Sequence, residues 1–169
     1  MATANTRVVR RTEALLSLRQ ESYGSNFTYQ EHAFHKTWFS AFKSIVITAI
    51  SVLVLMSPLK RAVKPFLPKP GEGPSEAVQE NGWFDCKYIV ETEDGQKSVF
   101  NMSAKGDPGY RVTSMLVSEC ALCLIEDIDS LPGGEGYGGV LTSASGLGDV
   151  LINRLRNAGI SFKGPILKD

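Results

Sequence analysis

The sequence predicts an α+β fold, in which an antiparallel hairpin or sheet packs with two main helices and one further hydrophobic helix lies close to a membrane. Three observations predict it. Two strand-like runs, 83–92 and 97–106, flank an Asp-Gly turn, which is typical of a β-hairpin. Apolar residues recur at helical spacing in 110–128 and again in 147–158. A third run, 44–57, carries no charge.

Charge divides the chain into two halves. Residues 1–70 hold 10 Lys and Arg against 3 Asp and Glu, and residues 71–169 hold 8 against 15, so the zero net charge is +7 beside −7. A basic half that also carries the uncharged run favours membrane lipid with an anionic surface as a partner. Nucleic acid is disfavoured, because the basic residues are scattered and no nucleic-acid-binding motif accompanies them. Three cysteines are too few for a disulfide framework and predict a reducing compartment for the soluble part.

We predict four segments along the chain, each with its own composition. The first is basic, the second is uncharged over most of its length, the third is basic and rich in proline, and the fourth holds the hairpin and both main helices. In that order they are the N-terminal basic segment 1–37, the hydrophobic membrane-associated helix 38–58, the linker 59–81 and the C-terminal α+β part 82–169.

The hydrophobic segment is long enough to cross a membrane only when it is extended back to Trp38. Residues 44–57 alone would span about 21 Å as a helix, against a hydrocarbon core of roughly 30 Å. Extended to Trp38, with Lys43 reaching toward the headgroups, the helix spans about 31 Å. A marginal span, an interfacial or hairpin anchor, a buried core helix and a buried strand all stay open. The membrane-segment residues are Trp38, Phe42, Ile45, Val52, Leu53 and Leu55.

Small hydroxyl residues recur every three or four positions in this segment. On a helix they form one narrow stripe, which either lets another helix approach closely in lipid or bonds back to the preceding turn. Both alternatives stay open. The stripe consists of Thr37, Ser40, Ser44, Thr48 and Ser51.

The remaining elements have predicted faces and ends. The run 110–128 is expected to be a largely buried helix after an Asp-Pro-Gly start signal, and the closing helix ends at Gly159 before a short terminal strand. Three shorter elements are a strand or helix start at 6–18, a strand at 25–34 and one helical turn after Ser75. The expected inner residues are Val112, Met115, Leu116, Ala121, Leu122 and Ile125 in the first helix and Leu147, Val150, Leu151 and Leu155 in the second.

A Gly-x-Gly-x-x-Gly spacing occurs at Gly134, Gly136 and Gly139, but its context does not suit a dinucleotide. A phosphate-binding loop leaves a buried strand and opens a helix, whereas here an acidic, proline-terminated run comes before the glycines. We therefore predict a connecting loop, and no cofactor bound by this chain.

No catalytic residue and no metal ligand is assigned. Cys120 and Cys123 lie within a predicted helix without a second pair, so they are expected to fill its buried face. His32 and His35 would point to opposite faces of the strand predicted at 25–34 if that strand extends to them.

Two segments of the C-terminal part carry a resemblance to a known family. AKGDPGYRVTSMLVSECALCL, at 104–124, resembles its Gly-Asp-Pro-Gly-Tyr helix start, and GGVLTSASGLGDVLINRLRNAGISF, at 138–162, resembles its Gly-Gly-Val-x-Thr-Pro-Ala segment and closing helix. On these motifs, most of residues 7–162 resembles the C-terminal part of the saccharopine dehydrogenase-like oxidoreductases, which include the trans-acting enoyl reductases. Ser143 stands where that family has proline. The family-motif residues are Asp107, Pro108, Gly109, Tyr110, Gly138, Gly139, Val140 and Thr142.

The resemblance implies a membrane-associated, substrate-side domain of a truncated oxidoreductase linked to lipid or glycolipid metabolism. Family members begin with a Rossmann domain, which we do not find here, so NAD(P) is implied only for the full-length family and no NAD(P) chemistry is expected of this chain alone. A separate Rossmann-domain chain or a homo-oligomer is the implied partner, and a lipid droplet, mitochondrion or plasma membrane is the implied location. A non-enzymatic membrane or lipid-droplet scaffold stays open as the alternative.

Overall fold

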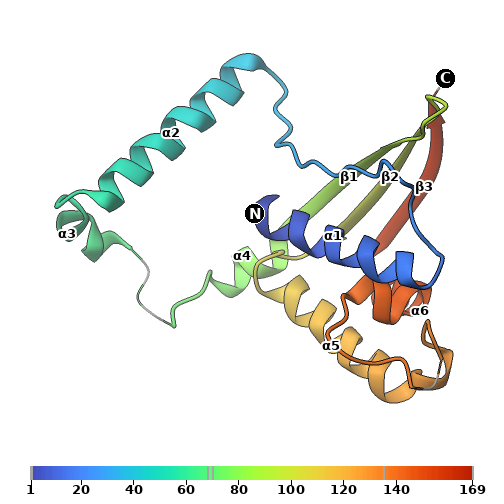
Figure 1. The fold of residues 1–169 in the computed structure, drawn as a ribbon. Coiled ribbons are helices and arrows are strands. Elements are labelled where there is room, and N and C mark those ends of the chain that lie inside the picture. Colours follow the sequence, from blue (N-terminus) through green and yellow to red (C-terminus); the bar gives the residue numbers. More distant parts are fainter. Residues whose placement is uncertain (1, 68, 70, 135, 169) are drawn as a thin grey trace. The chain divides into compact units, whose positions relative to one another are not determined.

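A computed structural model describes residues 2–67, 69, 71–134 and 136–168 (Figure 1). Within them the chain forms six α-helices, two short 3-10 helices and a three-stranded antiparallel sheet, so the predicted α+β class is confirmed. The helices are α1 (Ala2–Leu18), α2 (Trp38–Met56), α3 (Lys60–Val63), η1 (Lys64–Phe66), α4 (Glu76–Asn81), α5 (Arg111–Glu126), η2 (Ile128–Ser130) and α6 (Ser143–Asn157). The strands are β1 (Trp83–Glu91), β2 (Lys97–Lys105) and β3 (Ser161–Lys168).

The described elements fall into two compact units. The first combines residues 1–29 with 74–169, and the second is residues 30–73. The first unit holds the sheet with α1, α4, α5 and α6, and the second holds α2 and α3. The first unit is therefore discontinuous in sequence.

The sheet has the order β1-β2-β3, and both neighbouring pairs are antiparallel. β1 and β2 form the predicted hairpin, with Trp83 opposite Lys105 at the end away from the turn. A bulge at 99–101 shifts the pairing of β2 with β3. Pro165, which has no N–H to donate, lies in β3, an edge strand, where proline is tolerated. The predicted hairpin and terminal strand are thus confirmed and belong to one sheet.

One half of the sheet packs against α5 and α6. Figure 1 shows both helices near one end of the strands, while the other end projects beyond them. Phe84, Met102 and Phe162, one from each strand, pack against the buried helix residues at the covered end. Such packing of one sheet face on helices gives the unit its apolar core. The core residues are Val112, Cys123, Leu147, Leu151, Leu155 and Ile160.

Helix α5 lies where it was predicted, but the prediction that it is largely buried is wrong. Only Val112 and Cys123 are buried, while Met115, Leu116 and Cys120 are partly buried against the core. The sheet and α6 cover one side of the helix, so the inner stripe continues through the two cysteines and the opposite side faces outward. The residues that were expected inside but are exposed are Ala121, Leu122 and Ile125.

Helix α6 begins at Ser143, four residues earlier than predicted, and bends at Gly148. Gly148 has φ +50° and ψ −136°, which interrupts the helical geometry and allows Pro132 to pack closely there. The predicted inner residues Leu147, Leu151 and Leu155 are buried. Gly159, with φ +97°, ends the helix as predicted.

Of the two elements predicted in the N-terminal segment, 6–18 is present as a helix and the strand at 25–34 is absent. Residues 6–18 belong to α1, which packs against α6, whereas 25–34 form no strand. The latter run has strand-like composition, but a strand needs a pairing partner. Asn26 instead donates a side-chain hydrogen bond of 2.9 Å to Glu93 in the β1–β2 turn. The helical turn predicted after Ser75 is confirmed as α4.

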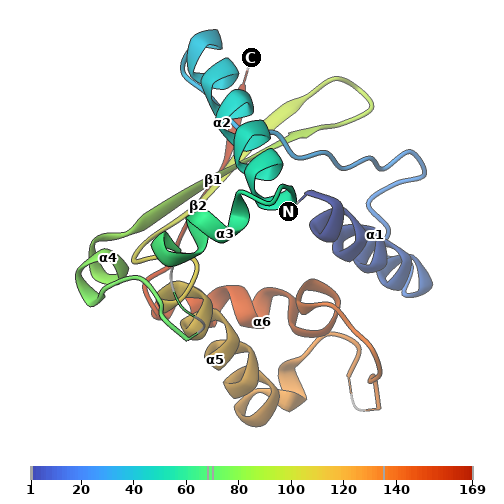
Figure 2. The same ribbon diagram turned by 90° about the vertical axis from the view of Figure 1, so that its left-hand side faces the viewer.

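In the second unit, α2 is an α-helix of 19 residues, about 29 Å long, and none of its residues is buried. The alternative of a buried strand is therefore wrong for the described residues, and the alternative of a buried core helix stays a prediction. Figure 2 shows the chain turning from α2 into α3. Between them Ser57 caps the end of α2, donating from its hydroxyl to the carbonyl of Val54 at 2.9 Å.

The hydroxyl stripe of α2 is bonded back to its own backbone. Ser40, Thr48 and Ser51 donate to the carbonyls of Thr37, Ser44 and Ile47 at 2.9, 2.9 and 2.8 Å. These bonds satisfy the hydroxyl groups without a partner helix.

Candidate functional site

The Asp-Pro-Gly-Tyr motif makes the turn from β2 into α5. The backbone N–H of Tyr110 donates to the Asp107 carboxylate at 2.8 Å, and the N–H of Val112 donates to the Asp107 carbonyl at 3.0 Å. The N–H of Asp107 in turn donates to the carbonyl of Gln79 in α4 at 2.8 Å. In this structure Asp107 therefore fixes the start of α5 and ties it to α4.

The second motif, residues 138–142, leads into α6 and meets α1. The Thr142 side chain accepts from the Ser145 N–H at the start of α6, and the Ser145 hydroxyl accepts from the Thr142 N–H. The hydroxyl oxygens of Thr12 and Thr142 are 2.7 Å apart, and Thr12 and Ser145 are buried. Arg11 donates to the carbonyl of Val140 at 3.2 Å. We call Thr12, Thr142 and Ser145 the hydroxyl junction, because they join α1 to α6.

The glycine-rich loop differs from a dinucleotide-binding loop in the element that precedes it. It follows η2 rather than a strand, and the N–H groups of Ser145 and Gly146 in the first turn of α6 are bonded to Thr142. The Tyr137 ring lies so close to Gly133 that a Cβ there would be 2.4 Å from the ring. Arg19 covers the same ring, with 5.1 Å from its guanidinium carbon to the ring centroid. The glycines at 133–139 thus allow Tyr137 to fold back on its own loop.

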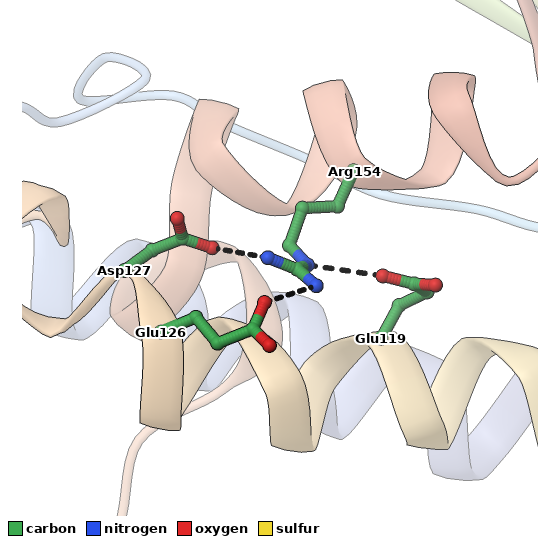
Figure 3. A network of polar contacts seen from close by, with 4 residues as sticks. All are labelled: Glu119, Glu126, Asp127 and Arg154. Carbon is green, nitrogen blue, oxygen red and sulfur yellow. Dashed lines mark hydrogen bonds and ion pairs between the residues drawn. The ribbon is translucent and has the colours of Figure 1, made fainter.

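Arg154 of α6 contacts three carboxylates of the segment that contains α5 (Figure 3). Its guanidinium lies 3.0 Å from Glu119, 2.9 Å from Glu126 and 2.8 Å from Asp127. Hydrogen bonds to Asp127 and then to Glu119 raise the pKa of Arg154 above its usual value. We name these four residues the Arg154 network.

The sequence analysis did not identify the Arg154 network. The signal that could have found it is the pair Arg154 and Arg156 near the end of the closing helix, together with the acidic end of the preceding helix, whose carboxylates have no basic residue nearby in sequence. One cation binds all three carboxylates and so joins α6 to the end of α5. We therefore assign the network a structural role rather than a role in acid–base catalysis.

The cysteines of α5 are protonated packing residues. Burial is the first cause that raises the pKa of both Cys120 and Cys123, and nearby carboxylates add to it. Among the described residues, no group of three His, Cys, Asp or Glu side chains is placed to hold a metal ion. His32 and His35 lie in the second unit and outside any strand.

Two surfaces of the first unit are open to a partner or ligand. The first is the projecting half of the sheet. Large apolar side chains are exposed there on both faces of the sheet: Ile89 and Ile166 on one face, and Tyr88, Val90 and Phe100 on the other. The second is a shallow open hollow at the start of β1, where an exposed Trp83 lies beside Asp85, Ser103 and Lys105. An apolar patch of this kind marks an interaction surface more often than a solvated one.

The third candidate surface is α2, in the second unit. Among the described residues it is the one helix that is long and apolar enough to cross a membrane. All six membrane-segment residues named from the sequence are exposed on it, including Trp38, Phe42 and Leu53. Core helices of globular proteins bury an apolar face, which α2 does not do within its unit.

These features define an α+β domain accompanied by an exposed apolar helix, and known proteins resemble nearly all of it. The chain is 37% identical to a Mycobacterium tuberculosis (strain H37Rv) protein whose name assigns it provisionally to the trans-acting enoyl reductases, over 96% of this chain and 39% of that protein. It is 33% and 31% identical to the trans-acting enoyl reductases of Mycobacterium ulcerans and Mycobacterium leprae, over 92% of this chain and 38% of each.

The similarity covers less than half of each relative. The chain spans 38–39% of the length of these relatives. No family model matches the sequence, and no solved structure matches it.

Proposed function

We propose that this chain is the substrate-side part of a trans-acting enoyl reductase of the saccharopine dehydrogenase-like kind, that it works at a membrane on a lipid or glycolipid precursor, and that it does not carry out NAD(P) chemistry alone. The observation that carries the proposal is 31–37% identity to trans-acting enoyl reductases over at least 92% of the chain. The exposed apolar helix α2 supports the membrane part of the proposal.

The proposed reaction divides the work between this chain and a cofactor-binding polypeptide. An enoyl reductase delivers a hydride to the β-carbon of an unsaturated acyl group and a proton to the α-carbon, so the double bond is reduced and the nicotinamide is oxidised. Two features of the glycine-rich loop support this division: it follows η2 rather than a strand, and the Tyr137 ring lies against Gly133. Under the proposal, a separate Rossmann domain binds the nucleotide, and residues of the present chain hold the substrate.

The two open surfaces of the first unit suit these two contacts. The projecting half of the sheet offers Ile89 and Ile166, which lie on one face, to a protein partner. The hollow beside Trp83 combines an aromatic surface with Asp85 and Lys105, a mixture that suits an acyl chain with a polar head. We assign the sheet surface to the partner and the hollow to the substrate.

Nucleotide titration tests the cofactor part of the proposal. The purified chain alone should leave NADPH fluorescence unchanged, and saturable binding in the micromolar range would contradict it. When mixed with the part of the M. tuberculosis relative that this chain does not match, the chain should support NADPH oxidation with an enoyl substrate. Ile89→Arg should abolish that gain, whereas Val117→Arg, an equally exposed apolar position on α5, should keep it.

Carbonate extraction of membranes tests the membrane part. We expect the chain to stay in the pellet, and Val52→Asp with Leu53→Asp to move it to the supernatant, because charges are costly in hydrocarbon. The matched control is Val117→Asp with Ile128→Asp, which adds the same charge to exposed apolar positions of the first unit. Complete release of the unsubstituted chain would exclude a spanning helix. Membrane retention without any NADPH oxidation in the mixture would favour the scaffold alternative.

A further inference from the structure

Three cations follow directly after the apolar helix α2. The chain leaves α2 at Met56, is capped by Ser57, passes Pro58 and re-enters a short helical stretch made of α3 and η1. Lys60, Arg61 and Lys64 lie in that stretch, and all three are exposed. We name residues 59–64 the basic turn.

The basic turn has two opposite sides. At about 100° per helical residue, Lys60, Arg61 and Lys64 fall within about 100° of arc. Leu59, Ala62 and Val63 fall on the opposite side of the same turn. Val63 is partly buried while the three cations are open. The arrangement is that of an amphipathic helix at a membrane surface, on a small scale.

The cations of the basic turn have no partner among the described residues. Their side chains make no hydrogen bond or ion pair there, although carboxylates lie elsewhere in the second unit. Glu72 instead accepts from the backbone N–H of Lys69 at 2.9 Å. Three exposed cationic side chains without a counter-charge among the described residues therefore follow the C-terminal end of α2.

We propose that the basic turn binds the phosphate groups of anionic lipids and so fixes the C-terminal end of α2 at an anionic membrane surface. This inference rests on the proposed membrane association and deepens it by naming the lipid class and the residues. The occupant is a lipid surface because charge and apolarity adjoin: α2 enters the acyl region while Lys60, Arg61 and Lys64 meet the headgroups. A nucleic acid would use the charge but leave α2 uncovered.

Vesicle flotation tests the inference. The whole chain is synthesised in a cell-free system with vesicles of pure phosphatidylcholine or with 30 mol% phosphatidylserine, and the fraction that floats is measured against lipid concentration. We expect half of the chain to float at a lipid concentration at least about tenfold lower with the anionic vesicles than with the neutral ones. Each cation near an anionic surface strengthens binding several-fold. Raising the salt to about 0.5 M should remove most of the difference, because it shortens the Debye length.

Two variants separate the basic turn from charge in general. The basic-turn variant carries Lys60→Gln, Arg61→Gln and Lys64→Gln. We expect it to bind anionic and neutral vesicles equally, with the affinity that the unsubstituted chain has for neutral vesicles. The control, Lys87→Gln with Lys97→Gln and Lys163→Gln, removes the same charge from exposed positions of the sheet outside the hollow and should keep the preference. Circular dichroism verifies that both variants fold.

The outcomes separate this inference from the proposed membrane association. Equal flotation of the unsubstituted chain on neutral and anionic vesicles would overturn the inference and leave the membrane association standing. An anionic preference that survives in the basic-turn variant would also overturn it. Failure to float on either vesicle would overturn the membrane association and the inference with it.

Discussion

The hydroxyl oxygens of Thr12 and Thr142 are 2.7 Å apart, although 130 residues separate them in the sequence. Thr12→Val keeps the side-chain shape and removes this contact. Because Thr12 is buried and Thr142 loses a hydrogen-bond partner, we expect the free energy of unfolding to fall by about 1–2 kcal/mol. Urea unfolding of the whole chain in mild detergent, followed by circular dichroism, measures it.

The control for this prediction is Thr6→Val. Thr6 lies on the same helix, but its hydroxyl donates only to the carbonyl of Ala2 at 2.7 Å. That change should stay within about 0.5 kcal/mol of the unsubstituted chain. Equal effects of the two substitutions would show that the hydroxyl junction does not hold α1 on α6.

The Arg154 network predicts a second stability effect. Arg154→Met keeps most of the apolar stem but leaves Glu119, Glu126 and Asp127 together without their cation. We expect the melting temperature to fall by several degrees, and the loss to shrink in high salt, which screens the remaining repulsion. Arg156→Met, on the same helix but outside the network, is the control for differential scanning calorimetry. A salt-independent loss would mean that packing rather than charge is responsible.

The bend of α6 gives a third prediction. Gly148→Ala would force a Cβ onto φ +50° and bring it 2.7 Å from the Pro132 ring. We expect the free energy of unfolding to fall by about 1–3 kcal/mol. Gly138→Ala, where a Cβ meets nothing within 4 Å, should be near neutral. If both variants melt like the unsubstituted chain, α6 does not need its bend.

Thiol labelling checks the burial of α5. Cys86 is exposed, whereas Cys123 is buried and Cys120 is partly so. Burial raises the pKa of both α5 thiols, so at pH 8 less of each is the reactive thiolate. With Ellman's reagent we expect one thiol to react rapidly in the native chain and all three in denaturant. Equal rates for Cys86→Ser and the unsubstituted chain would contradict this assignment.

The parts of the fold that the sequence predicted well are those that short-range patterns determine. The Asp-Gly turn between two β-rich runs predicted the hairpin, and the spacing of Leu147, Leu151 and Leu155 predicted the inner face of α6. Gly159 predicted the end of that helix because a C-cap glycine acts within one turn.

The parts that were missed depend on distant residues. The inward position of Cys120 and Cys123 was predicted, but the pattern of α5 also favoured Leu122 and Ile125, which are exposed because α6 and the sheet cover only one side of the helix. Residues 25–34 have the composition of a strand, and no local pattern could reveal that a pairing strand is lacking for them. The contacts of the candidate site were missed for the same reason, because they join residues that are distant in the sequence.

The motif residues were picked from the sequence, but their contacts were not. Asp107 proved to fix a helix start, and Thr142 to meet α1 through Thr12. Those contacts follow only from the three-dimensional arrangement of α1 and α6. The exposed apolar helix α2, in contrast, could be predicted from composition, since length and apolarity are local properties.

The discontinuity of the first unit has a consequence for the order of events during synthesis. α1 is made before α2, but α6, on which it docks, is made after both. Leu15 and the rest of the docking face of α1 therefore leave the ribosome long before their partner exists. During that interval α2 also emerges, so this apolar helix leaves the ribosome before the first unit can close.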